Sequence, residues 1–173
     1  MEHIEIKKAS LHDLEVLRNI GKETFRETFS AENTEEDMQN YLNESFSIEK
    51  LETELNNTNS EFYFATFNNN VIGYLKLNYG AAQTEVKDEN ALEIERIYVL
   101  KEFHGKQVGQ LLYNKALQIA KHTNINYLWL GVWEKNQRAI SFYGKNGFVA
   151  FDKHIFKLGN DEQIDIMMKL ELK

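Results

Sequence analysis

Cysteine and proline are both absent from this chain of 173 residues. Without cysteine, the protein has no disulfide, no thiol nucleophile and no zinc site built from thiolates. No apolar run approaches the ~20 residues that a membrane-spanning helix needs. The opening residues MEHIEIKKAS also lack the apolar segment of a signal peptide. We therefore expect a cytoplasmic protein that does not cross a membrane.

Basic residues are in the minority, because 20 Lys and Arg stand against 27 Asp and Glu, for a formal net charge of −7. An acidic surface repels phosphate and no basic block compensates for it, so we expect no nucleic-acid partner. The same charge would attract a cationic small molecule, or it could serve solubility alone. The five histidines show no paired spacing such as H-x-x-x-H, and we expect no metal.

Apolar periodicity predicts one domain over residues 1–173, since no repeat or linker divides the chain. Helices are expected after the cap residues Ser10, Thr34 and Ser47, and again from Val108 to Ala120 and from about Asn136 to Asn146. Strands are expected at 4–7, 62–67, 71–77, 92–99, 127–133, 148–152 and 163–172, with a turn at 68–70. The strand, helix and strand over 92–133 predict a parallel pair. The fold class is therefore α/β, with one mixed, mostly antiparallel sheet and helices on both faces.

Two segments combine unusual residue types at suggestive spacing. The run GVWEKNQRAISFYGKNGF (131–148) places Asn136, Tyr143 and Gly147-Phe148 along one helix that follows a strand. Upstream, His104-Gly-Lys-Gln-Val-Gly109 lies between a strand and a helix. Glycines there let the backbone expose consecutive amides at a helix N-terminus, which suits a pyrophosphate. A glycine in such a turn is more often only a turn, so this loop is weak evidence by itself.

Taken together, the two segments resemble the GNAT superfamily of N-acetyltransferases. The hexad at 104–109 aligns with the family's Q/R-x-x-G-x-G/A loop, although His104 replaces Gln/Arg and Gln107 replaces the inner glycine. The second segment fits V-x-x-x-N-x-x-A-x-x-F/L-Y-x-K-x-G-F well. Nearly the whole chain is similar to PaiA-type spermidine/spermine N-acetyltransferases, through ETFRETFSAENTEEDMQNYL, LEIERIYV, LGVWEKNQRAISFYGKNGF and GNDEQIDIMMKL. The resemblance implies the GNAT fold, with a splayed parallel pair at the centre of the sheet.

The resemblance also implies acetyl-CoA as co-substrate and assigns residues to it. The splayed strand would pair with the pantetheine arm, the loop would hold the pyrophosphate, and the second segment would supply further contacts. The implied residues are Ile97, Tyr98, Val99, His104, Gly105, Lys106, Gln107, Val108, Gly109, Gln110, Glu134, Lys135, Asn136, Arg138, Tyr143 and Lys145. Asn136 can serve as a helix N-cap at the same time. The side chain of Gln107 could crowd the pyrophosphate or strain the backbone.

Tyr143 matches the family's general acid. A phenol with a pKa near ~10 can give a proton to a thiolate whose thiol has a pKa nearer ~8.5. The alternative is that Tyr143 only packs, like its neighbour Phe142. Glu95 is the candidate base, through a water, and Glu93 competes with it because alternation places both carboxylates on one face with Ile97 and Val99. Either glutamate could instead be solvated or paired with Arg96 or Lys76.

The resemblance implies direct acetyl transfer to a primary amine, with a polyamine such as spermidine or spermine as partner, and it is compatible with a homodimer. The first two helices shape the acceptor groove in this family. Their acidic residues could recognise a polyamine or simply favour a helix start through its dipole. These residues are Glu27, Glu32, Glu35, Glu36 and Asp37. Rival interpretations are an enzyme for another amine or a protein N-terminus, and a CoA-binding regulatory module without turnover.

Overall fold

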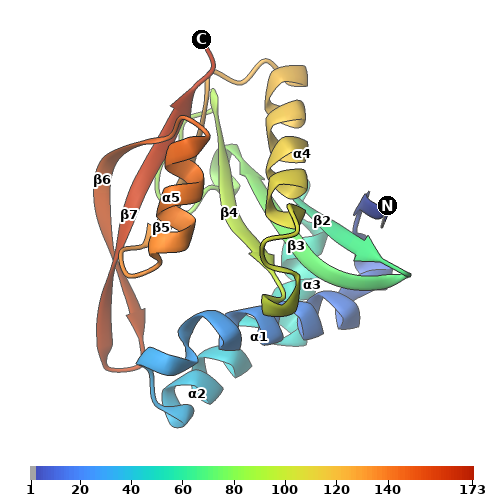
Figure 1. The fold of residues 1–173 in the computed structure, drawn as a ribbon, viewed down its shortest axis with the longest axis vertical. Helices are drawn as coiled ribbons and strands as arrows, with labels where there is room; N and C mark the ends of the chain where they lie inside the picture. Colours follow the sequence, from blue (N-terminus) through green and yellow to red (C-terminus); the bar gives the residue numbers. More distant parts are fainter. Residues whose placement is uncertain (1–2) are drawn as a thin grey trace.

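The computed structural model describes residues 3–173 and contains a seven-stranded sheet in the order β1-β2-β3-β4-β5-β7-β6 (Figure 1). The strands are β1 (Ile4–Lys8), β2 (Ser60–Phe67), β3 (Asn70–Tyr79), β4 (Ala91–Val99), β5 (Tyr127–Trp133), β6 (Val149–Leu158) and β7 (Asp161–Glu171). The helices are α1 (Leu14–Phe29), α2 (Glu35–Ser45), α3 (Ile48–Asn56), α4 (Val108–His122) and α5 (Gln137–Lys145). Among the described residues, no helix has the length and apolar character that crossing a bilayer requires.

Local signals place most of these elements where the sequence predicts them. Ser10 forms a capping box with Asp13, and the hydroxyls of Thr34 and Ser47 accept hydrogen bonds from the first turns of α2 and α3. Asn68 and Asn69 adopt φ of 50° and 66°, which closes the β2–β3 hairpin. Polar side chains that replace missing helical hydrogen bonds therefore set the helix starts.

The C-terminal hairpin is longer than expected. The sequence predicts a strand at 148–152, whereas β6 runs from Val149 to Leu158 and pairs with β7 along almost its whole length. The stretch 152–157 mixes charged and apolar residues on an exposed edge strand, so its strand character depends on its pairing partner.

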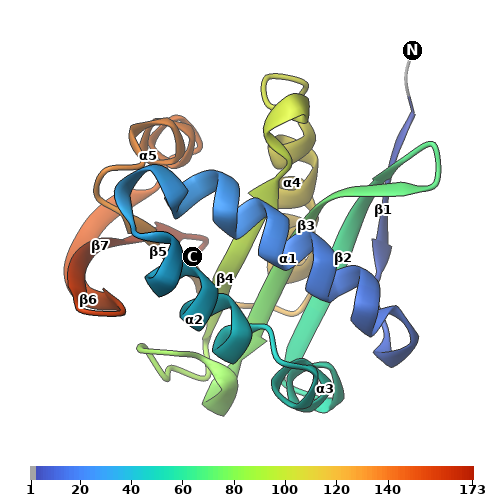
Figure 2. The ribbon, with the colours of Figure 1, turned by 90° about the horizontal axis from the view of Figure 1, so that it is seen from below.

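Helices cover both faces of the sheet. Helices α4 and α5 lie on one face, and α1, α2 and α3 lie on the other (Figure 2). The core between these layers contains large, fully buried side chains such as Leu17, Met38, Leu75 and Leu112. The mixed sheet and its two helical layers confirm the predicted fold class.

Strands β4 and β5 are the parallel pair, and they separate at their C-terminal ends. Pairing covers only Ala91–Glu93 against Tyr127–Trp129, although β4 continues to Val99 and β5 to Trp133. In Figure 1 the two strands diverge below this point. Residues of both separated ends, Ile97, Tyr98 and Trp133, line hollows on the two faces of the sheet.

A β-bulge at Glu95 changes which side chains share a face. Lys76 of β3 opposes Arg96, while the next residue of β3 opposes Ile94, so Glu95 is the extra residue of β4. Arg96 and Tyr98 therefore join Glu93 on the face covered by α1 and α2. The prediction from simple alternation, that Ile97 and Val99 share this face, is wrong because the bulge shifts the alternation by one residue.

Candidate active site

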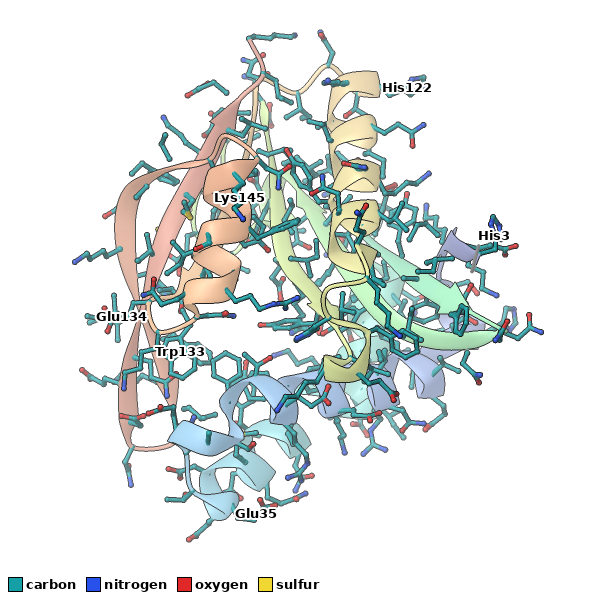
Figure 3. The ribbon with its side chains drawn as sticks, in the orientation of Figure 1. His3, Glu35, His122, Trp133, Glu134 and Lys145 are labelled. Carbon is teal, nitrogen blue, oxygen red and sulfur yellow. The ribbon has the colours of Figure 1, made fainter. Side chains whose placement is uncertain are left out.

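Two hollows meet where β4 and β5 separate. A cleft of about 870 Å³ lies on the α4 and α5 side, and a cavity of about 280 Å³ lies on the α1 and α2 side. We name the larger hollow the cleft, and the smaller one the acceptor cavity because it lies on the side where the resemblance implies an acceptor groove. Six residues line both: Ile97, Tyr98, Trp133, Asn136, Ala139 and Tyr143. In Figure 3, Trp133 lies near the end of β5, between α5 and the α1–α2 layer.

The loop before α4 presents backbone amides to the cleft. Gly105 has φ of 78° and Gln107 has φ of 64°, both in the left-handed region. Gln107 is the N-cap of α4, and its side chain makes no capping hydrogen bond. The first amides of α4, at Val108, Gly109 and Gln110, therefore remain available at the positive end of the helix dipole. Gln107 fits this turn, but a left-handed backbone is strained for any residue with a side chain.

Most of the residues that the resemblance assigns to acetyl-CoA line the cleft. They are Ile97, Tyr98, Val99, His104, Gly105, Gln107, Val108, Gly109, Gln110, Lys135, Asn136, Arg138, Tyr143 and Lys145. Glu27 and Thr28 of α1 line it too, and the Glu27 carboxylate accepts a hydrogen bond of 3.0 Å from the amide of Lys101. Sequence reasoning missed this use of α1, because nothing local to Glu27 indicates contact with a loop 74 residues away.

Three of the assigned residues have other contacts. The Nε2 of His104 lies 2.8 Å from the carbonyl oxygen of Val99 and fastens the loop to the end of β4. The ammonium of Lys106 lies 5.2 Å from the ring centre of Phe103, and Lys106 does not line the cleft. Glu134 does not line it either, and its amide donates to the carbonyl oxygen of Ile164. The lysine and arginine side chains that line the cleft, and could contact a phosphate, are Lys101 ahead of the loop and Lys135, Arg138 and Lys145 on and beside α5.

Helix α5 carries Tyr143 into the junction of the two hollows. The Asn136 side chain caps this helix by accepting a hydrogen bond of 3.2 Å from the amide of Ala139. Tyr143 is buried, packs against Phe142 and Phe148, and makes no side-chain hydrogen bond to the residues that the structure describes. Burial raises the pKa of its hydroxyl. The phenol therefore keeps its proton at neutral pH, in a side chain that lines both hollows.

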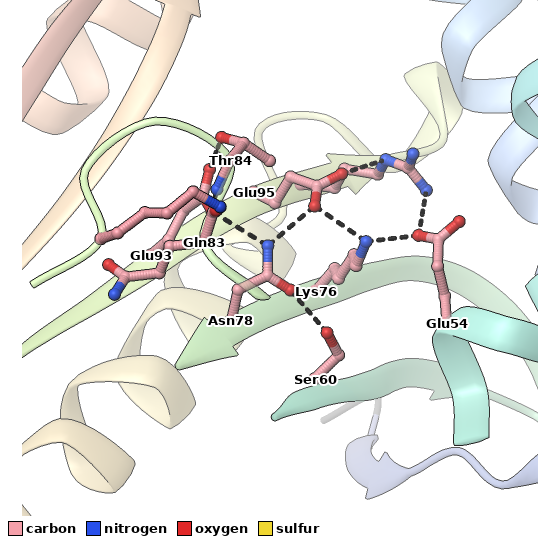
Figure 4. A network of polar contacts seen from close by, with 10 residues as sticks. Glu54, Ser60, Lys76, Asn78, Gln83, Thr84, Glu93 and Glu95 are labelled. Atoms are coloured by element: carbon pink, nitrogen blue, oxygen red, sulfur yellow. Dashed lines mark hydrogen bonds and ion pairs between the residues drawn. The ribbon is translucent and has the colours of Figure 1, made fainter. Parts of the chain in front are cut away.

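Glu95 lies at the centre of a buried ion-pair network (Figure 4). Its carboxylate accepts hydrogen bonds from Asn78 at 2.8 Å and lies 2.8 Å from the Lys76 ammonium and 3.3 Å from Nε of Arg96. Glu54 of α3 pairs with Lys76 and lies 3.8 Å from Arg96. Burial would raise the pKa of Glu95, but the charges of Arg96 and Lys76 outweigh it and hold that pKa at about 2. The sequence left open whether Glu95 is paired with Arg96 or Lys76, and these contacts show that it is paired with both. A catalytic role for Glu95 stays a prediction.

Glu93 is also fully engaged. Its carboxylate accepts hydrogen bonds from the Asn78 amide group at 3.0 Å and from the backbone amide of Thr84 at 2.8 Å, and the Thr84 hydroxyl binds its other oxygen. Burial raises the pKa of Glu93 against the opposing effect of these hydrogen bonds. Both carboxylates of β4 are thus held by protein groups.

The acceptor cavity obtains further carboxylates from segments that sequence reasoning did not single out. Glu85 belongs to the loop before β4 and lies 3.1 Å from Nδ1 of His154, while Asp165 lies on β7. Gly131 of β5 forms part of the wall and is exposed to this space despite its place in a central strand. A charged residue in the otherwise apolar run IDIMM was the available signal for Asp165.

None of the acidic residues of α1 and α2 lines the acceptor cavity. Glu35 pairs with Arg26 at 2.9 Å, and Glu32 lies 3.4 Å from the ammonium of Lys135. Glu35, Glu36 and Asp37 form the first turn of α2, where the helix dipole favours negative charge. Their contacts agree with the helix-start interpretation rather than with recognition of an acceptor.

Comparison with known proteins matches residues 15–148 to the acetyltransferase (GNAT) family. This chain belongs to the GNAT family. It is 40% identical to an uncharacterised N-acetyltransferase from the pepI 3′ region of Lactobacillus delbrueckii, over 99% of each chain. It is 32% identical to spermidine N(1)-acetyltransferase of Thermoplasma acidophilum, over 86% of this chain and 90% of the relative.

The solved structure of PaiA N-acetyltransferase from Thermoplasma acidophilum in complex with coenzyme A superimposes with a TM-score of 0.80. It is 30% identical, with 98% of this chain and 99% of that chain covered. The protein is therefore an acetyl-CoA-dependent N-acetyltransferase of the GNAT fold. The free amides of α4 and the cations of α5 suit the phosphates of this co-substrate.

Proposed function

We propose that this GNAT enzyme acetylates a primary amine of a polyamine such as spermidine or spermine, by direct transfer while both substrates are bound. The observation that carries the proposal is the carboxylate-lined acceptor cavity that opens onto Tyr143. Carboxylates in a partly enclosed space favour a cationic ligand, because the low dielectric strengthens their attraction. The name of the Thermoplasma relative, a spermidine acetyltransferase, supports the same substrate class.

We infer a place in the cleft for each part of acetyl-CoA from the residues that line it. In this proposal the amides of Val108, Gly109 and Gln110 receive the pyrophosphate, and Arg138 and Lys145 add positive charge. The pantetheine arm follows the free edge of β4 at Ile97–Val99, which β5 leaves unpaired. This path brings the thioester to the residues shared by both hollows.

Tyr143 then acts as the general acid. As the amine attacks the thioester carbon, the C–N bond forms and the C–S bond breaks, and the departing thiolate takes the phenolic proton. Because burial keeps this phenol protonated, the proton is available throughout the neutral pH range. The ammonium group of the substrate loses one proton, which ends in solvent, before the nitrogen attacks, and the second proton that the nitrogen loses restores the phenol.

A panel of acceptors tests the proposal. Purified enzyme, saturating acetyl-CoA and spermidine, spermine, an N-terminal peptide or an uncharged aromatic amine would be compared by release of free thiol. We expect kcat/KM to be highest for the polyamines and to fall as salt screens the cavity charges. Preference for the peptide would indicate another GNAT acceptor, and acetyl-CoA binding without turnover of any amine would indicate a regulatory module.

A further inference from the structure

Asp165 differs from the other carboxylates of the acceptor cavity in having no hydrogen-bond donor among residues 3–173. Asn78 and Thr84 donate to Glu93, Lys76 and Arg96 pair with Glu95, and Glu85 pairs with His154. Asp165 is half-buried and lines the same cavity as Tyr143. A partly buried carboxylate that no protein donor holds is free to accept a hydrogen bond from a ligand, such as the ammonium group of an acceptor.

The sheet register aims this side chain at the floor of the cavity. Asp165 pairs with Trp133 of β5 on one side and with His154 of β6 on the other, so all three side chains share a face. An alanine Cβ at position 131 would lie 3.6 Å from Oδ2 of Asp165. The missing side chain of Gly131 therefore leaves space directly beside the carboxylate.

We propose, on the basis of the acceptor function above, that the Asp165 carboxylate accepts the proton of the acceptor's ammonium group. Oδ1 or Oδ2 takes one N–H proton, which leaves a neutral amine whose lone pair attacks the thioester carbon. The nitrogen loses its second proton on collapse, and that proton replaces the one Tyr143 gives to the thiolate. Asp165 releases its proton to solvent, so one proton is liberated per acetyl transferred.

The surroundings suit this role better than those of Glu95. Burial raises the pKa of Asp165 to about 6, against the opposing effect of His154, whereas the pKa of Glu95 is about 2. A general base works best when its pKa lies near the operating pH. The titratable and charged side chains that line the cavity together with Asp165 are His154 of β6, Glu85 of the loop before β4, Tyr41 of α2, Tyr74 of β3, Glu93, Glu95, Arg96 and Tyr98 of β4, and Tyr143 of α5.

The test compares Asp165→Asn with wild type and with Glu162→Gln, an exposed carboxylate change on the same strand. With spermidine and saturating acetyl-CoA, we expect Asp165→Asn to lower kcat about a hundredfold, within the range of a lost general base. Wild-type kcat/KM should fall below about pH 6. In Asp165→Asn it should instead rise steadily toward the pKa of the amine, near ~10. Glu162→Gln should match wild type.

Stability separates this role from a structural one. Asparagine is nearly isosteric and removes a charge that burial disfavours, so Asp165→Asn should melt at or above the wild-type temperature at pH 7. A variant that keeps wild-type kcat and pH profile, or that raises only the KM for the amine, overturns the assignment of Asp165 alone. A wild type that acetylates no amine of the panel overturns both this inference and the proposed function.

Discussion

Replacing Glu95 with glutamine tests whether the buried network around it is chiefly structural. The change removes one negative charge and leaves Lys76 and Arg96, with side chains only 6% and 13% exposed, facing Glu54 alone. An uncompensated charge at such a site typically costs about 3–5 kcal/mol. The pKa of Glu95 gives a consistent figure, because holding it at about 2 instead of 4.5 corresponds to about 3 kcal/mol in favour of the folded, ionised form.

Thermal and acid unfolding measure this loss. For a domain of this size each kcal/mol shifts the melting temperature by about 2–4 °C, so Glu95→Gln should melt on the order of 10 °C below wild type at pH 7. Since the folded-state pKa of Glu95 is lowered, its contribution is complete above about pH 4.5 and disappears as the pH falls toward 2. The variant should therefore lose most of its stability difference from wild type over that interval.

A double variant provides the control. Lys76→Met removes one cation together with the carboxylate, so Glu95→Gln/Lys76→Met leaves Arg96 and Glu54 as a balanced pair and should melt above the single variant. Glu162→Gln, on the surface, should melt like wild type. If Glu95→Gln unfolds at the wild-type temperature and acetylates far more slowly, the structural reasoning is refuted and Glu95 acts in catalysis.

Three further predictions concern the cleft and the cavity. Tyr143→Phe should lower kcat by about 10²–10⁴-fold, with acetyl-CoA affinity and melting temperature nearly unchanged because the hydroxyl has no partner among residues 3–173; single-turnover kinetics and calorimetry check this. Gln107→Gly should relieve the left-handed strain and raise stability by about 1 kcal/mol with no loss of acetyl-CoA affinity, and denaturant unfolding that shows destabilisation would contradict it. Gly131→Val should raise the KM for the amine at least about tenfold while the KM for acetyl-CoA stays near wild type, with Gly131→Ala intermediate; an equal loss for both substrates would mean general damage to the site.

The sequence alone was sufficient for what depends on local chemistry. Capping residues such as Ser10, Thr34 and Ser47 fix helix starts, because they bond backbone groups within three residues. The strand-to-helix spacing around Tyr143 is set by a single helix and its capping Asn136. The family assignment rested on the segments 104–109 and 131–148, and comparison with known proteins confirmed it.

Only the tertiary structure decided which charges meet. The extra residue at Glu95 moves Arg96 and Tyr98 onto the acceptor face, and an alternation rule carries no information about such an insertion. The low pKa of Glu95 depends on Lys76, 19 positions away in the chain, and the environment of Asp165 depends on pairing among β5, β6 and β7. Burial and Coulomb energy depend on distances in space, which residue order along the chain does not specify.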